Sequence, residues 1–247
     1  MSVVALADDV RATVGARGFA VVPGDLYRIP ELRDRWAALS DDWNHLEIDA
    51  YMADGGRYRR RRFGRFAFVP ATAQLQRLPH ATVFQSREVN GFAGGIDRDF
   101  APLRESTFGD AALLALIRFD FGCFEVPDAT MLTDTWEVWV HQIRIDAAGS
   151  DGVSPAPEGT HHDGHDFIAM HLVTRNNIAG GLNHIYDNGE RPVHACMLRN
   201  PLDTIYADDH RVMHAVDPIR PLDAARPSYR DILIIDYDHR PALLRGG

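Results

Sequence analysis

Three features that often define a protein class are scarce in this sequence: cysteines, long apolar runs and an excess of basic residues. Two cysteines are too few for a disulfide framework, and Cys123 and Cys196 both lie in apolar surroundings that are typical of buried, reduced thiols. No run approaches the roughly 18 apolar residues of a membrane span, and the first residues lack a basic leader. The formal net charge of −9 argues against nucleic acid as a partner. We therefore expect a cytoplasmic protein that binds neither nucleic acid nor membranes.

The length and composition are those of a globular protein with a full core. Of the 247 residues, 45% are apolar and 25% are charged, as in ordinary soluble domains. All-β proteins of this length are commonly single domains. We expect one domain over residues 1–247, with a helical cover over about 1–125 and a β core over about 135–240.

The spacing of apolar residues predicts a mainly β protein with flanking helices. Helical spacing indicates helices at 3–14, 30–39 and 110–123, and β-rich composition indicates strands at 19–23 and 135–145. The second half contains six strand-like runs separated by turns, at 167–174, 181–186, 193–198, 203–206, 211–216 and 231–237. Short, closely spaced strands of this kind favour a sandwich or a jelly-roll barrel.

A histidine-rich stretch, 158–166, follows a loop rich in glycine and proline and precedes an apolar strand. In extended chain, His161 and Asp163 share one face because they are two residues apart. A nitrogen ligand beside an anionic oxygen ligand suggests part of a metal site. The alternative is a surface loop in which the two side chains cap a turn at Asp163-Gly164.

A third ligand is available in the later strand at 211–216. His210 and His214 both lie on one face of that strand. We favour His214, because it lies in the apolar part of the strand, whereas His210 adjoins a turn. Two histidines and one carboxylate form the facial set that holds non-haem Fe(II) and leaves positions open for other ligands. We expect the remaining nearby histidines to support the site or the core instead of binding metal: His165, His171 and His184.

Residues 57–68 form the one concentrated basic run in this acidic chain. Alternation along a strand sends Arg60, Arg62 and Phe66 to one face and Arg59, Arg61, Phe63 and Arg65 to the other. Half of these arginines are thus available to line a pocket, where their planar forks suit carboxylates. A solvated face and a nucleic-acid patch are the alternatives.

Several motifs resemble those of one family, and together they span most of the chain. They are Tyr58-Arg59-x-Arg61-Arg62-Phe63, the segment 139–144, Glu158-Gly159-x-His161-x-Asp163-Gly164, Asn177-Ile178 with Gly180-Gly181, Asp209-x-Arg211-Val212-x-His214-x-Val216-x-Pro218-Ile219, and Tyr229-Arg230-Asp231-Ile232-Leu233. Taken together, they resemble the bacterial 2-oxoglutarate/Fe(II) dioxygenases related to isoleucine 4-hydroxylase.

The resemblance implies a double-stranded β-helix, the jelly-roll core of cupin-like proteins. It implies Fe(II) bound by His161, Asp163 and His214, with 2-oxoglutarate held by Arg230 and Arg226 as the runner-up for that role. O2 is the co-substrate, and ascorbate is expected as an accessory reductant. The family hydroxylates free aliphatic L-amino acids, and some members oxidise the sulfur of methionine. The small-molecule substrate expected here is therefore a free L-amino acid.

The contacts to such a substrate do not follow from spacing. Candidate residues for its carboxylate, its ammonium group or the pocket wall are Arg59, Arg61, Arg62, His141, Glu137 and Asp166. Within this set, His141 is equally compatible with a pocket and with a core position. Two other functions stay open: a jelly-roll metalloprotein with isomerase or hydrolase activity, and a non-catalytic protein that binds a small molecule. A homodimer is expected on general grounds.

Overall fold

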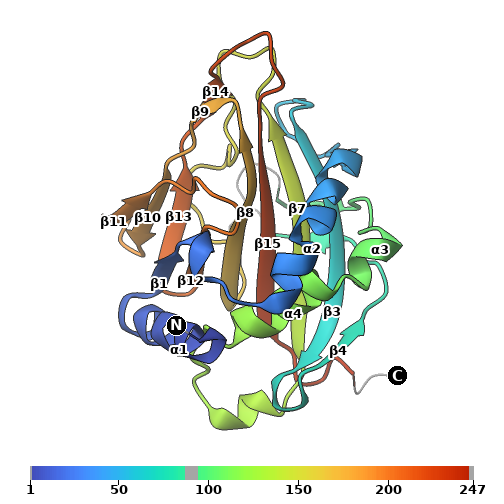
Figure 1. The fold of residues 1–247 in the computed structure, drawn as a ribbon, viewed down its shortest axis with the longest axis vertical. Helices are drawn as coiled ribbons and strands as arrows, with labels where there is room; N and C mark the ends of the chain where they lie inside the picture. The colour runs from blue at the N-terminus through green and yellow to red at the C-terminus, as the bar shows by residue number, and fades with distance from the viewer. Residues whose placement is uncertain (1, 87–93, 245–247) are drawn as a thin grey trace.

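A large antiparallel sheet organises the protein. A computed structural model describes residues 2–86 and 94–244 (Figure 1). In spatial order, the strands of the main sheet are β1 (Phe19–Val22), β12 (Thr204–Asp208), β8 (Phe167–Asn176), β15 (Tyr229–His239), β7 (Trp136–Asp146), β3 (Arg59–Val69) and β2 (Glu47–Ile48), and β4 (Gln74–Arg77) pairs with β3. The long strand β15 pairs along its length with both β8 and β7 and therefore lies at the centre.

Smaller antiparallel sheets complete the β structure. They contain β11 (Pro192–Cys196), β10 (Asn183–Asp187) and β13 (Val212–Val216) in one sheet, β14 (Ile219–Pro221) and β9 (Ile178–Gly180) in a second, and β5 (Val83–Phe84) and β6 (Asp97–Arg98) in a third. The first two lie on the side of the main sheet that contains β8, β12 and β1 (Figure 1). Gly180, with a φ of 79°, allows the close crossing of β9 and β14, because a Cβ there would lie 2.1 Å from the carbonyl oxygen of Pro218.

The helices cover the opposite face of the main sheet, where α2 and α4 cross β15, β7 and β3 (Figure 1). They are α1 (Val3–Arg17), α2 (Pro30–Asp41), α3 (Glu105–Phe108) and α4 (Ala111–Phe121), with short 3₁₀ turns at Gly24–Leu26, Asp42–His45, Pro70–Thr72 and Ala129–Leu132. Ser2 accepts a hydrogen bond from the amide of Ala5 and so caps α1, and Asp110 caps α4 through the amide of Ala112. No helix in the described part of the chain is long and apolar enough to cross a membrane.

The two larger apolar clusters of the described residues lie on the two faces of the main sheet. One packs α1, α2 and α4 against Trp136, Tyr237 and their neighbours. The other lies between the main sheet and the smaller sheets and includes Ile168, Leu172 and Ile185. Facing antiparallel sheets around an apolar interior are the predicted jelly-roll arrangement. The alternation predicted for 57–68 is also confirmed, since Arg59 and Arg61 face the interior and Arg62 contacts the other side.

The structure differs from the expected helical cover over residues 1–125. This region supplies β1 to β4, and β3 extends the main sheet by pairing with β7. The reason is that Phe63, Phe66 and Phe68 bury side chains on both faces of β3, which a covering helix could not do. Cys123 and Cys196 are both free, and Cys196 is only partly buried.

A polar network crosses the core between α4 and the sheet. Asp120, fully buried, accepts hydrogen bonds from Nε2 of His171 at 2.9 Å and from the hydroxyl of Tyr206 at 2.7 Å. Thr204 contacts Nδ1 of His171 at 2.8 Å, and Tyr27 joins the same network. Buried polar groups are tolerated when they are paired in this way. The predicted core role of His171 is confirmed.

Replacing Asp120 with alanine should lower the free energy of unfolding by roughly 2–4 kcal/mol, because His171 and Tyr206 lose their acceptor inside the core. Urea unfolding followed by circular dichroism measures this loss. Asp25→Ala, at an exposed position, is the control and should change stability by no more than about 0.5 kcal/mol. Equal losses in the two variants would contradict a special role for the network.

Candidate metal centre and its pocket

Backbone pairing brings two of the predicted ligands together. The amide of His161 donates to the carbonyl of His214 at 3.0 Å, and the amide of His214 donates back to the carbonyl of His161 at 3.0 Å. This reciprocal pair fixes the loop after Gly159 against β13 and places both rings on one side, with centroids 4.4 Å apart.

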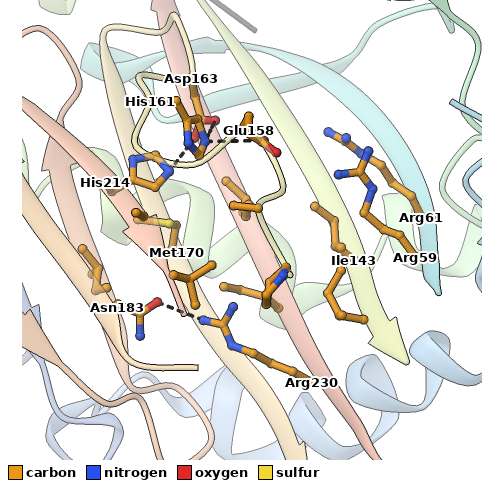
Figure 2. Close-up of a pocket in the computed structure, with 18 of the residues that line it drawn as sticks. Arg59, Arg61, Ile143, Glu158, His161, Asp163, Met170, Asn183, His214 and Arg230 are labelled. Carbon is orange, nitrogen blue, oxygen red and sulfur yellow. Dashed lines mark hydrogen bonds and ion pairs between the residues drawn. The ribbon is translucent and has the colours of Figure 1, made fainter. Parts of the chain in front are cut away.

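Asp163 completes the group from the same loop. Its carboxylate oxygens lie 3.3 Å from Nε2 of His161 and 3.5 Å from Nε2 of His214. One ligand atom from each residue can be chosen so that all lie within 4.8 Å of one another. Figure 2 shows the three side chains converging at the top of a pocket. The structure thus brings together the three residues that the sequence suggests as metal ligands.

The electrostatics of this cluster fit a divalent cation. Burial opposes the charged form of His161, but the ion pair with Asp163 and the charge of Glu158 raise its pKa to about 9. Burial acts against ionisation of Asp163 as well, yet His214 and His161 hold its pKa well below the usual range. Burial lowers the pKa of His214 and keeps its nitrogens neutral. The anions around His161 therefore favour a positive charge at this point, which a divalent cation would supply in place of the proton. Two neutral imidazoles and one carboxylate are a donor set suited to Fe(II).

Asp209 holds the loop that carries Asp163. Its buried carboxylate accepts hydrogen bonds from the amides of Asp163 at 3.2 Å, Gly164 at 2.7 Å and His165 at 3.1 Å. Three consecutive amides bound by one side chain leave the loop little freedom. In the sequence, Asp209 stands out only as the first residue of the motif that contains His214, five residues later, and nothing there indicates that it holds the loop.

Of the other histidines, His165 supports the site as predicted, whereas His184 lies in neither the pocket nor the core. His165 lies behind the loop, paired with Asp238 at 3.1 Å, and although burial lowers its pKa, Asp236 and Asp238 raise it to about 10. His184 pairs with Asp217 at 2.9 Å. His210, the rival third ligand, points outward and contacts Asp166 at 2.8 Å, with 70% of its side chain exposed.

One end of the pocket is apolar and contains Arg230. The walls here are Ile143, Ile145, Met170, Ile205, Ile232 and Ile234. Arg230 is buried and donates to the side-chain oxygen of Asn183 at 3.1 Å (Figure 2). Burial and the nearby Arg175 lower the pKa of Arg230 to about 10. No carboxylate among residues 2–86 and 94–244 pairs with Arg230, whereas the runner-up Arg226 is exposed outside this pocket.

The other end of the pocket is polar. It is lined by Arg59, Arg61, Gln85, Arg98 and Glu158. Arg59 is paired with the buried carboxylate of Asp49 at 2.7 Å. Arg61 donates to Nδ1 of His141 at 2.7 Å. His141 is buried directly behind Arg61, and burial together with the charge of Arg61 holds its pKa well below the usual range.

Three other candidate contacts lie elsewhere. Arg62 donates to the carbonyls of His45 and Pro102, Glu137 pairs with Arg65 at 2.6 Å, and Asp166 contacts His210. The sequence did not indicate Arg98, Asn183 or Arg175, because they lie in irregular or unremarkable stretches. Glu158 was visible only as part of a motif. The face of β3 that lines the pocket, and so the choice of Arg61 over Arg62, also needed the structure.

A family model and two relatives match most of this chain. The model of the 2OG-Fe dioxygenase family matches residues 40–236. L-isoleucine-4-hydroxylase of Bacillus thuringiensis is 26% identical over 203 residues, 81% of each chain, and 3(1)-hydroxy-L-isoleucine 4-dioxygenase of Pantoea ananatis is 23% identical over 237 residues, 90% of this chain and 92% of that protein.

Solved structures with the same fold include a bsmA homologue from Methylobium petroleophilum, with a TM-score of 0.79, 29% identity and 96% of each chain covered. The IDO protein of Bacillus thuringiensis has a TM-score of 0.75 at 20% identity, covering 97% of this chain and 96% of its own. These matches confirm the predicted jelly-roll fold.

Asp209→Ala should weaken metal binding by roughly 10- to 100-fold, because the loop that positions Asp163 loses three hydrogen bonds. An anaerobic Fe(II) titration measures the affinity. Asp187→Ala is a matched control, since Asp187 likewise accepts backbone hydrogen bonds, from Gly189 and Arg191, in the turn that ends β10 and outside the pocket. Equal Fe(II) affinity in wild type and Asp209→Ala would show that the loop needs no such support.

Proposed function

The chain belongs to the 2OG-Fe dioxygenase family, and we propose that it hydroxylates or sulfoxidises a free L-amino acid while 2-oxoglutarate is converted to succinate. The family uses Fe(II), 2-oxoglutarate and O2. The observation that carries the proposal is the convergence of His161, Asp163 and His214 on one pocket whose opposite, apolar end holds an arginine without a carboxylate partner among the described residues.

In this proposal, His161, Asp163 and His214 would hold the iron through two imidazole nitrogens and one carboxylate oxygen. The bound iron would supply the oxidising chemistry, in which one oxygen atom of O2 enters the amino acid and the other enters succinate as 2-oxoglutarate loses carbon dioxide. The protein contributes position, a water-poor pocket and fixed charges. Asp209 and the His161–His214 backbone pair keep the ligand atoms in place.

Arg230 is the proposed partner of the distal carboxylate of 2-oxoglutarate. It is buried at the apolar end of the pocket, and its hydrogen bond to Asn183 orients the guanidinium group. A carboxylate is the strongest hydrogen-bond partner for a guanidinium group in such surroundings. Because the metal ligands and Arg230 line the same pocket, the two-carboxylate cosubstrate would reach from one to the other. The exposed position of Arg226 gives it no comparable access.

The amino-acid substrate is supported by two independent features. Two curated relatives are named for isoleucine or hydroxyisoleucine oxidation. The second end of the pocket is lined by arginines and Glu158, which offer both signs of charge to a small zwitterion. We propose that this end receives the substrate.

The decisive test is the visible charge-transfer band that appears when 2-oxoglutarate chelates Fe(II) without oxygen. We expect the band in the wild-type protein and its loss in His214→Ala, because the variant lacks one of the two nitrogen ligands. Circular dichroism establishes that both proteins are folded. No band in folded wild-type protein with iron supplied would refute the proposed function.

Arg230→Met should raise the KM for 2-oxoglutarate roughly tenfold to a hundredfold, the value of a charge-assisted hydrogen bond, with a much smaller effect on the KM for the amino acid. Arg226→Met is the control and should leave both constants unchanged. Succinate release measures both. A large effect in Arg226→Met and none in Arg230→Met would reverse the assignment.

A further inference from the structure

The polar end of the pocket contains charged groups whose buried atoms lack partners. Within residues 2–86 and 94–244, Nε of Arg61, Nε of Arg98 and Oε2 of Glu158 are buried without a hydrogen bond. Native proteins leave few such atoms unpaired, and those that occur need an explanation. All three residues line the same pocket, so a ligand in that pocket is within reach of all of them.

The arginines there lack a matching anion. Asp49 already forms an ion pair with Arg59, and no carboxylate in the described ranges forms one with Arg61 or Arg98. Arg61 lies 4.2 Å above the ring of Phe100 and donates to a neutral His141, and Arg98 bonds to the side chain of Gln85. Burial and repulsion from Arg59 lower the pKa of both guanidinium groups. An incoming carboxylate would relieve this repulsion and fill the free donors.

Glu158 supplies the opposite charge at the same end. Its Oε1 lies 3.7 Å from Nε2 of His161, and its other oxygen has no partner among the described residues. Figure 2 shows Glu158 between the metal ligands and the arginines, with its carboxylate turned toward the pocket. An ammonium group has no acceptors of its own and needs such an oxygen when it leaves water.

The other candidate acceptors are already paired away from this pocket: Glu137 binds Arg65, and Asp166 contacts His210. An α-amino acid carries its ammonium and carboxylate groups on one carbon, so its receptor must offer an anion and a cation across a small space. We propose that Glu158 binds the ammonium group of the substrate and that Arg98 and Arg61 bind its carboxylate. This assignment rests on the proposed function and specifies how the site selects α-amino acids.

The selection has two separable parts. A 2-hydroxy acid retains the carboxylate but lacks the ammonium group, and an amino-acid methyl ester retains the ammonium group but lacks the carboxylate charge. Wild-type protein should discriminate against both analogues. Glu158→Gln should lose its preference for the amino acid over the hydroxy acid, and Arg98→Gln should lose its preference for the acid over the ester.

The experiment first identifies the best substrate among the twenty standard L-amino acids by succinate release. It then compares that amino acid with its 2-hydroxy acid and its methyl ester in each variant. We expect the preference for the amino acid over the hydroxy acid to fall at least about tenfold in Glu158→Gln, while the preference over the ester persists, and the reverse in Arg98→Gln. General damage to the pocket would not produce this crossed pattern.

Glu47→Gln is a matched control, because Glu47 is exposed and pairs with Arg62 outside the pocket. Each variant is also loaded with Fe(II) and 2-oxoglutarate to record the charge-transfer band. Loss of the band in Glu158→Gln would overturn the proposal by assigning Glu158 to the metal centre. Unchanged preferences in both variants would overturn it too, as would a wild type that forms the band but accepts no amino acid, whereas absence of the band in wild type would count against the dioxygenase function itself.

Discussion

The reciprocal hydrogen bonds between the backbones of His161 and His214 are the constraint on which the site depends. They join a loop without regular structure to β13, a strand that also pairs with β10. A histidine pair joined through the main chain keeps its spacing even when the side chains move, and Asp163 is then positioned by the short chain between it and His161. The backbone amides of Asp163 and Gly164 complete this arrangement by donating hydrogen bonds to Asp209, a residue close to the same strand. The donor set is therefore an outcome of β pairing, and its precision comes from the rigidity of the scaffold.

The two faces of the main sheet have different roles: one packs against the helices, and the other lines the pocket. Along β15, Leu233 and Tyr237 pack into the helical layer, while Arg230, Ile232 and Ile234 face the pocket. Because side chains alternate along a strand, successive residues of β15 point in turn to the helical layer and to the pocket. A change of register by one residue would exchange these roles and would place a guanidinium in the apolar core. The helices over the other face hold this register by burying the large aromatic side chains, so the cover and the pocket depend on each other.

The sequence predicted the parts of the site that are local or strongly patterned. The helices and main strands lie within a few residues of the predicted bounds, and the grouping of His161, Asp163 and His214 followed from spacing and strand polarity. Alternation correctly separated Arg61 from Arg62, but nothing local indicated which face of β3 meets the pocket. That choice depends on β7, more than seventy residues later along the chain. Arg98 and Asp209 were missed for the same reason: their importance comes from partners that only the fold brings near.

The pocket contains arginines that its own carboxylates do not fully neutralise. Anionic ligands in the pocket would therefore stabilise the fold as well as take part in the reaction. Arg230 at one end, and Arg61 and Arg98 at the other, are arginines removed from water without carboxylate partners among the described residues. Isolated buried charges are costly, so the folded protein gains most when anionic groups occupy both ends. Ligands that bind only the native state stabilise it in proportion to their affinity. Under the proposed function, 2-oxoglutarate and the amino acid would therefore complete the electrostatics of the fold as well as the reaction, and the carboxylates that confer specificity would be the same groups that relieve the repulsion between the arginines.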